Sequence, residues 1–277
     1  MPEHPPATTT GATSPPVTGP APLSLRQRRR AVATQEIVEA AERHLDEHGP
    51  AALSLRAVAR SLGMTVQALY HYFPNRDALV TVLITRAYDD LADAVQTAVG
   101  TPSEGLTPAD GRTPAPGEPV PPFVKACESY RAWAVTHPER FQLIYGTPLR
   151  DYTAPVEGPT TRAMRRMSAV FQQVFFSGFS QDQLAAADTH ALPAPLRTHL
   201  DLLSDAEGPE PLPPAAAALL LSAWGHMHGL VVLEVFGHTT FLGGHQAEIF
   251  RMAMHHLLTD THRRIPGPAP EPSAKRL

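Results

Sequence analysis

The chain has 277 residues, a formal net charge of −4 and 30 prolines, and its one cysteine, Cys127, excludes an internal disulfide. A single cysteine is typical of a reducing compartment, so we expect a cytoplasmic protein. The length allows one large or two small domains. The sequence contains no nucleophile elbow, phosphate-binding glycine loop or dinucleotide fingerprint, which argues against the commonest enzyme classes.

Prolines separate folded from flexible parts of the chain. Seven of them lie within 1–22, a segment with almost no large apolar residue, so residues 1–25 are expected to form a disordered arm. This arm lacks the apolar stretch of a secretory signal. A proline- and glycine-rich linker is expected at 100–120 and a flexible tail at 265–277.

Helical periodicity accounts for the rest of the chain, and no alternating β-branched run predicts a sheet, so the expected fold is all-α. The first helix is expected near 27–48 and ends at Gly49-Pro50. Two short helices follow within 53–73, and 75–99 is expected to be a long connecting helix. Further helices are expected near 121–136, 138–146, 159–178, 181–203, 213–237 and 244–263.

Residues 53–79, LSLRAVARSLGMTVQALYHYFPNRDAL, are the most informative segment. Ser54 and Thr65 precede the two short helices, where a hydroxyl can cap free N–H groups, and Gly63 lies at the turn between them. The residues expected to face inward are Leu55, Val58, Ala59, Leu62, Leu69, Phe73 and the ring of Tyr70. This pattern indicates a helix-turn-helix, which places its second helix in the major groove of DNA.

Positive charge is concentrated in the same part of the chain. Residues 26–86 carry nine arginines against six acidic residues, and Arg26, Arg28, Arg29 and Arg30 are the densest group. Binding to phosphates requires a local basic patch rather than a positive net charge. The negative net charge of the chain therefore does not argue against DNA binding.

Residues 26–86 resemble the DNA-binding domain of the tetracycline-repressor (TetR) family of transcription regulators. The resemblance lies in the first helix ending in EHG, in LSLRAVARSLGMT and in LYHYFPNRDALV. Trp224, His228 and Gly229, within AWGHMHGLVVLE, are similar to the Trp-His-Gly signature of one C-terminal domain type of the family. The resemblance implies an N-terminal three-helix helix-turn-helix domain at 26–74 and a larger helical ligand-binding and dimerisation domain at 121–264.

The resemblance also implies roles at the DNA. Thr65 and Tyr70 would contact phosphates, and Arg56 would reach a base edge or a phosphate. The second helix would face the bases, where glutamine can pair with adenine. Two residues depart from the family pattern, Arg76 for a lysine and Tyr72 for a frequent histidine. The expected DNA-binding set is Arg28, Ser54, Arg56, Thr65, Val66, Gln67, Ala68, Tyr70, His71, Tyr72 and Arg76.

Aromatic and methionine residues between 121 and 236 predict a second activity, the sensing of a small molecule. Such side chains suit an apolar cavity with a few polar groups, although singly they also fit an ordinary core. In the family mechanism the ligand shifts the helix at 75–99 and separates the two DNA-binding domains. The expected ligand-binding residues are Tyr130, Trp133, Phe141, Met164, Met167, Phe171, Trp224 and His228.

One helix with so few strong base-reading groups would bind DNA weakly, so we expect a homodimer on double-stranded DNA with a palindromic operator. The two C-terminal helices would form the dimer contact. Their expected contact residues are Leu219, Leu220, Leu230, Leu233, Phe250 and Leu257. The expected function is that of a repressor released by a small-molecule effector, with no cofactor and no metal.

Two alternatives are weighed from the sequence alone. The chain could be a helical metal-binding or enzymatic protein, because 44–48 (HLDEH) matches a zinc-peptidase pattern and the C-terminal region is rich in histidine. The segment 215–237 is long enough to cross a membrane. Glu234, His226 and His228 would be costly there, so we expect a helix at a subunit interface rather than a membrane span.

Overall fold

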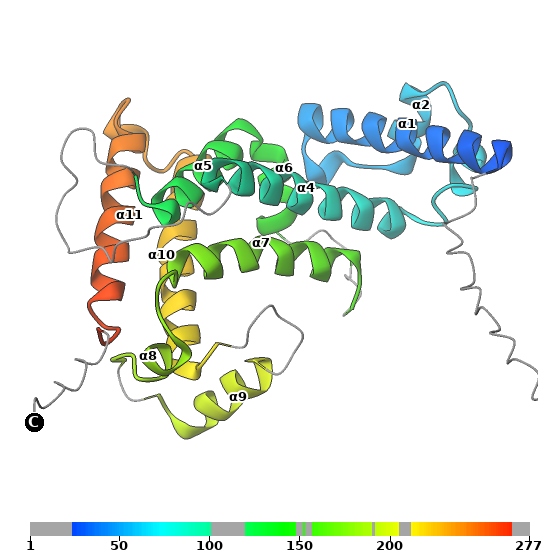
Figure 1. The fold of residues 1–277 in the computed structure, drawn as a ribbon. Helices are drawn as coiled ribbons and strands as arrows, with labels where there is room; N and C mark the ends of the chain where they lie inside the picture. Colours follow the sequence, from blue (N-terminus) through cyan, green and yellow to red (C-terminus); the bar gives the residue numbers. More distant parts are fainter. Residues whose placement is uncertain are drawn as a thin grey trace, which may run out of the picture.

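A computed structural model of the chain describes residues 24–100, 120–147, 152, 157–189, 192–204 and 212–267. All regular secondary structure in these ranges is helical (Figure 1), so the predicted all-α fold is confirmed. Residues 1–23 of the expected arm, 101–119 of the expected linker and 268–277 of the expected tail lie outside the described residues.

The N-terminal elements agree with the predicted helix-turn-helix domain, which we call the head. They are α1 (Leu25–His48), η1 (Pro50–Ala52), α2 (Leu55–Ser61) and α3 (Val66–Tyr70), followed by the connecting helix α4 (Arg76–Val99). Ser24 and Gln27 form a capping box at the start of α1. Gly49 ends α1 with φ of 77°, a conformation that glycine adopts without strain.

The head has its own hydrophobic core. Ile37 and Leu45 from α1, Val58 from α2, Leu69 from α3 and Leu79 from α4 are all buried in it. Leu143 and Ala163, from helices of the second domain, belong to the same cluster. The head therefore packs directly against the rest of the chain.

The remaining helices form the second, larger domain, which we call the effector domain. They are α5 (Pro122–Thr136), α6 (Pro138–Tyr145), α7 (Pro159–Phe175), α8 (Gln181–Ala185), α9 (Ala194–Ser204), α10 (Pro214–Val235), η2 (Thr240–Leu242) and α11 (Gln246–His262). Proline occupies the first turn of α5, α6, α7 and α10, where no backbone N–H is needed. In Figure 1, α4 runs from the head along α7, and α11 lies far from the head.

One predicted helix, 181–203, is wrong. Helix α8 ends at Ala185 and α9 begins only at Ala194. Pro193 directly precedes α9 and Pro195 lies in its first turn. A proline removes a backbone donor and clashes with the preceding turn, so a continuous helix through these positions would be broken.

Helix α10 leaves much of its apolar surface uncovered by the chain. It is the one helix of the described ranges that is long and apolar enough to cross a membrane, and 28% of its most apolar window is buried. Leu221 and Leu233 are exposed on α10, Phe236 is exposed directly after it, and Met252 is exposed on α11. Two of the expected dimer contacts, Leu219 and Phe250, instead pack into the domain's own core because they face inward.

Candidate nucleic-acid interface and effector site

The turn between α2 and α3 is fixed by the caps that the sequence predicts. The hydroxyl of Ser54 accepts a hydrogen bond of 3.2 Å from the backbone N–H of Ala57. The hydroxyl of Thr65 accepts a hydrogen bond of 3.1 Å from the backbone N–H of Ala68. Gly63 lies between the helices with φ of 65°, which a side chain would strain. Each capping hydroxyl keeps its own proton to donate elsewhere.

Helix α3 presents one polar face to solvent. Thr65, Gln67 and His71 are exposed, Val66 and Ala68 are half-buried, and Leu69 is buried beneath them. Tyr70, whose ring we expected to face partly inward, is 44% exposed and therefore lies on the outer face. Arg56 on α2 and Arg28 near the start of α1 are exposed as well.

Two arginines hold the ends of the helix-turn-helix. The Nη2 of Arg30 on α1 donates a hydrogen bond of 2.9 Å to the carbonyl oxygen of His71, and its guanidinium lies 5.7 Å from the ring centre of Tyr72. The Nε of Arg76 donates one of 3.2 Å to the carbonyl of Leu53. Tyr72 and Arg76, expected at the DNA, thus also have contacts within the head.

In the effector domain, six side chains form what we call the aromatic cluster: Tyr130, Phe141, Tyr145, Phe171, Trp224 and His228. The ring of Tyr130 lies 5.4 Å from that of Trp224 and 5.9 Å from that of Phe171. The hydroxyl of Tyr130 is 2.8 Å from Nδ1 of His228, and the Trp224 and His228 rings are stacked. Five of the eight expected ligand-binding residues therefore come together.

Tyr145 is the member of the aromatic cluster that is absent from the expected ligand-binding residues. Its position four residues after Phe141 on α6 was the available signal, since that spacing places both rings on one helix face. The Tyr145 hydroxyl is buried near the hydroxyls of Tyr130 and Tyr88 but forms no hydrogen bond of acceptable geometry among the described residues. An unpaired buried hydroxyl is unfavourable and calls for an explanation.

The aromatic cluster is uncharged at neutral pH. Burial raises the pKa of both tyrosine hydroxyls, Tyr130 and Tyr145, so they stay protonated. Burial lowers the pKa of His228, so its ring stays neutral. A ligand held here would meet rings and neutral hydrogen-bonding groups.

Three of the expected ligand-binding residues, Met164, Met167 and Trp133, lie outside the aromatic cluster. Met164 is 43% exposed, because α7 turns Met167 rather than Met164 toward the core. Met167 is buried in the same hydrophobic core as the aromatic cluster. Trp133 is buried, but its indole N–H donates to a carboxylate oxygen of Asp90 at 2.9 Å and its ring lies against His137.

The histidines of 44–48 make local contacts. The His44 and His48 rings stack at 4.5 Å, and each ring lies within hydrogen-bond distance of a backbone carbonyl. Within the described residues, no group of three or more histidine, cysteine or acidic side chains is placed to hold a metal ion.

Comparison with known proteins decides the family. Residues 37–83 match the model of bacterial regulatory proteins of the tetR family, and residues 123–257 match that of the tetracyclin repressor-like C-terminal domain. The chain is 34% identical over 213 residues to the HTH-type transcriptional regulator Rv1816 of Mycobacterium tuberculosis, covering 76% of this chain and 84% of that protein. The chain belongs to the TetR family.

Solved structures share this fold. A protein assigned a regulatory role, SCO4313, is 30% identical, with a TM-score of 0.62 over 85% of this chain and 99% of its own. A tetR-family regulator from Streptomyces coelicolor shares the fold at 17% identity, with a TM-score of 0.50 over 86% of this chain and 88% of its own. The chain is thus a transcriptional regulator with a TetR-type DNA-binding domain, as the sequence predicts.

Proposed function

We propose that this TetR regulator binds a palindromic operator as a homodimer in the cytoplasm, represses transcription there and is released by a small uncharged molecule. The observation that carries the proposal is the polar outer face of α3. Thr65, Gln67, Tyr70 and His71 are exposed on a helix whose opposite side is locked into the head by Leu69. These exposed polar side chains suit the edges and phosphates of a duplex.

Within this interface the residues have different tasks. Gln67 and His71 would read base edges, with Val66 and Ala68 against them, and Arg56 would reach a base or a phosphate. Thr65, Tyr70, Ser54, Arg28 and Arg76 would contact the phosphate backbone. The Thr65 and Ser54 hydroxyls would donate the protons that their capping bonds do not use. Tyr72 would extend this contact beyond the groove.

The homodimer is supported by the surface of α10 and α11. Leu221 is 67% exposed, and Leu233, Phe236 and Met252 are exposed with it. Gly225 and Gly229 on α10 have open space beside their Cα atoms, so another helix backbone can approach closely there. An apolar surface of this kind, on a protein whose reading helix is short, favours pairing with a second copy.

Release by an effector is supported by the aromatic cluster. The unpaired hydroxyl of Tyr145 offers a hydrogen bond to a polar atom of a ligand, and the neutral rings around it favour an uncharged molecule. Helix α6, which carries Phe141 and Tyr145, contacts α4 as well as α5. A ligand that displaces these rings would move α4 and with it the head, provided that it prefers one head spacing.

Selection from a pool of random duplexes tests the proposal. The full chain should recover a palindromic sequence, and the affinity for it should fall steeply with salt, because released counterions set that slope. Leu221→Glu should abolish both dimerisation and operator binding. Met164→Glu, an equal charge change at an exposed position of α7, is the matched control and should leave both intact. Recovery of no common sequence would refute the proposal.

A further inference from the structure

Helix α6 lies between the aromatic cluster and the head. Phe141 and Tyr145 point into the aromatic cluster, whereas Leu143 belongs to the core of the head. At its first turn, Glu139 approaches the end of α1 so closely that a Cβ atom at Gly49 would lie 2.8 Å from the carboxylate. One short helix thus touches both of the sites that a ligand-controlled DNA-binding protein must connect.

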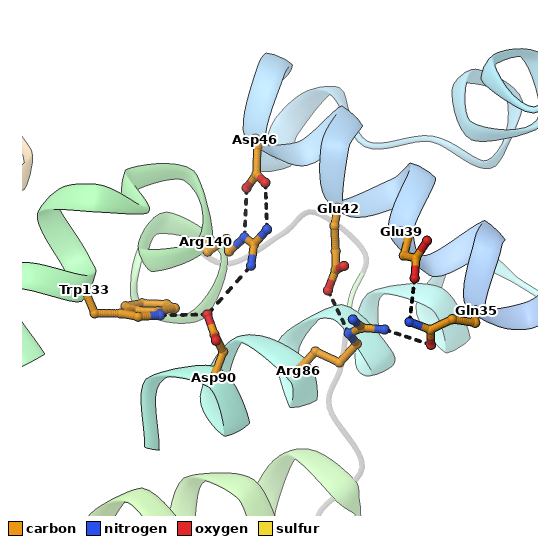
Figure 2. A network of polar contacts seen from close by, with 8 residues as sticks. All are labelled: Gln35, Glu39, Glu42, Asp46, Arg86, Asp90, Trp133 and Arg140. Atoms are coloured by element: carbon orange, nitrogen blue, oxygen red, sulfur yellow. Dashed lines mark hydrogen bonds and ion pairs between the residues drawn. The ribbon is translucent and has the colours of Figure 1, made fainter. Parts of the chain in front are cut away.

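The polar contact between α6 and α1 is made by Arg140 (Figure 2). Its Nε and Nη2 donate hydrogen bonds of 2.9 and 2.7 Å to the two carboxylate oxygens of Asp46 on α1. Paired, parallel bonds of this type fix orientation as well as distance. The Arg140 side chain is 23% exposed, so water competes with the pair less than it does on an open surface.

The same guanidinium reaches a second carboxylate. Its Nη1 lies 3.8 Å from the Oδ2 of Asp90 on α4, and this oxygen accepts the indole N–H of Trp133 on α5 at 2.9 Å. Arg140 therefore joins the head helix α1 to α4, α5 and α6 at one point. Arg86 makes a second link from α4 to Glu42 on α1 at 2.8 Å, and Glu42 also interacts electrostatically with Arg140.

We propose that Arg140 is the positioning residue through which the effector domain sets the orientation of the head on DNA. This role presupposes the proposed operator binding and adds the residue that carries the coupling. Because the paired hydrogen bonds from Arg140 to Asp46 are directional and Arg140 is on the same helix as Phe141 and Tyr145, a displacement of these rings is passed to α1. Coupling between two sites is reciprocal, so we expect operator binding at the head to restrain α6 in turn.

Hydrogen exchange tests this without knowledge of the effector. The probe is the duplex selected by the full-length wild-type chain, and the readout is amide exchange over 138–146 with and without it. In the wild type we expect the duplex to slow this exchange about fivefold, at the lower end of common coupling between sites. Arg140→Gln should lose this slowing and weaken operator binding about fivefold, because fewer heads have the right orientation.

Arg165→Gln is the matched control. It removes a similar pair of hydrogen bonds, of 2.8 and 3.2 Å to Glu157, which lies within the effector domain. We therefore expect this variant to show the same slowing of exchange and the same operator affinity as the wild type. Asp46→Ala removes the other half of the Arg140 fork and should reproduce Arg140→Gln, which keeps the test open if the arginine variant does not fold. Wild-type slowing and affinity in either variant would overturn the role of Arg140, as would the absence of slowing in the wild type. A selection that recovers no duplex would instead refute operator binding itself.

Discussion

Arg30, in the second turn of α1, donates a hydrogen bond of 2.9 Å to the carbonyl oxygen of His71, directly after α3. Its guanidinium also lies 5.7 Å from the ring centre of Tyr72. His71, the residue directly after α3, is therefore hydrogen-bonded to a residue of α1 that lies 41 positions earlier in the sequence. Since α3 has only five residues, we expect this hydrogen bond to help set the angle at which the helix would enter the groove.

Arg30→Lys should weaken operator binding several-fold while leaving its salt dependence unchanged. Lysine keeps the positive charge but lacks the planar guanidinium, which at Arg30 contacts both the His71 carbonyl and the Tyr72 ring. Arg29→Lys is the control, because it makes the same change next to it on α1. Fluorescence anisotropy over a salt series measures both quantities. Equal affinities for the two variants would show that Arg30 does not position α3.

Gln67→Ala should relax the preference for one base pair in each half of the operator, at a cost of about 1–3 kcal/mol for the preferred base. Tyr70→Phe should instead weaken binding to all sequences equally, because a phosphate contact carries no sequence information. Competition among operator variants changed one base pair at a time distinguishes the two effects. An unchanged base preference in Gln67→Ala would place the groove-reading face elsewhere.

Removing the hydroxyl from each of two tyrosines of the aromatic cluster should change the free energy of unfolding in opposite directions. Tyr145→Phe removes a buried group without a partner and should raise the free energy of unfolding by about 1 kcal/mol. Tyr130→Phe removes the partner of His228 and should lower it by about 1 kcal/mol. Urea unfolding at pH 7.5 measures both. A comparable loss in the two variants would mean that the Tyr145 hydroxyl is satisfied in solution.

Stability should fall as the pH is lowered through the titration range of histidine. Burial lowers the pKa of His262, although its bond to the Phe175 carbonyl raises it slightly. The unfolded chain then binds more protons, so the stabilisation is complete above the ordinary histidine pKa of about 6.5 and is lost below it. Burial adds the same effect at His228.

His262→Gln tests the part due to this residue, because glutamine can still donate to the Phe175 carbonyl but cannot be protonated. Urea unfolding at pH 7.5 and 5.5 should show a smaller loss of stability in the variant than in the wild type. An identical loss would assign the pH dependence to other groups.

The head could be predicted from the sequence because its signals are local. Ser54, Gly63 and Thr65 lie within a few residues of the helices that they cap or separate, and the spacing of Val58 and Leu69 follows from helix geometry. The expected helices at 27–48 and 75–99 agree with α1 and α4 to within two residues. Outside the head, Pro193 and Pro195 interrupt the helix that we expected at 181–203.

The effector domain could be predicted less well, because its site depends on which face of each helix turns inward. Met164 and Met167 are three residues apart and equally apolar, yet only Met167 is buried. Tyr145 joins the aromatic cluster through contacts with α10, which periodicity does not reveal. The paired hydrogen bonds between Arg140 and Asp46 join residues 94 positions apart, so no local sequence pattern predicts them.

The central claim is that the outer face of α3 is presented to DNA twice, by a paired molecule. Native mass spectrometry of the full chain with its selected duplex tests this most directly. We predict complexes with an even number of chains per duplex, lost when the two halves of the palindrome are moved apart by half a helical turn. A complex of one chain per duplex, indifferent to that spacing, would contradict the account.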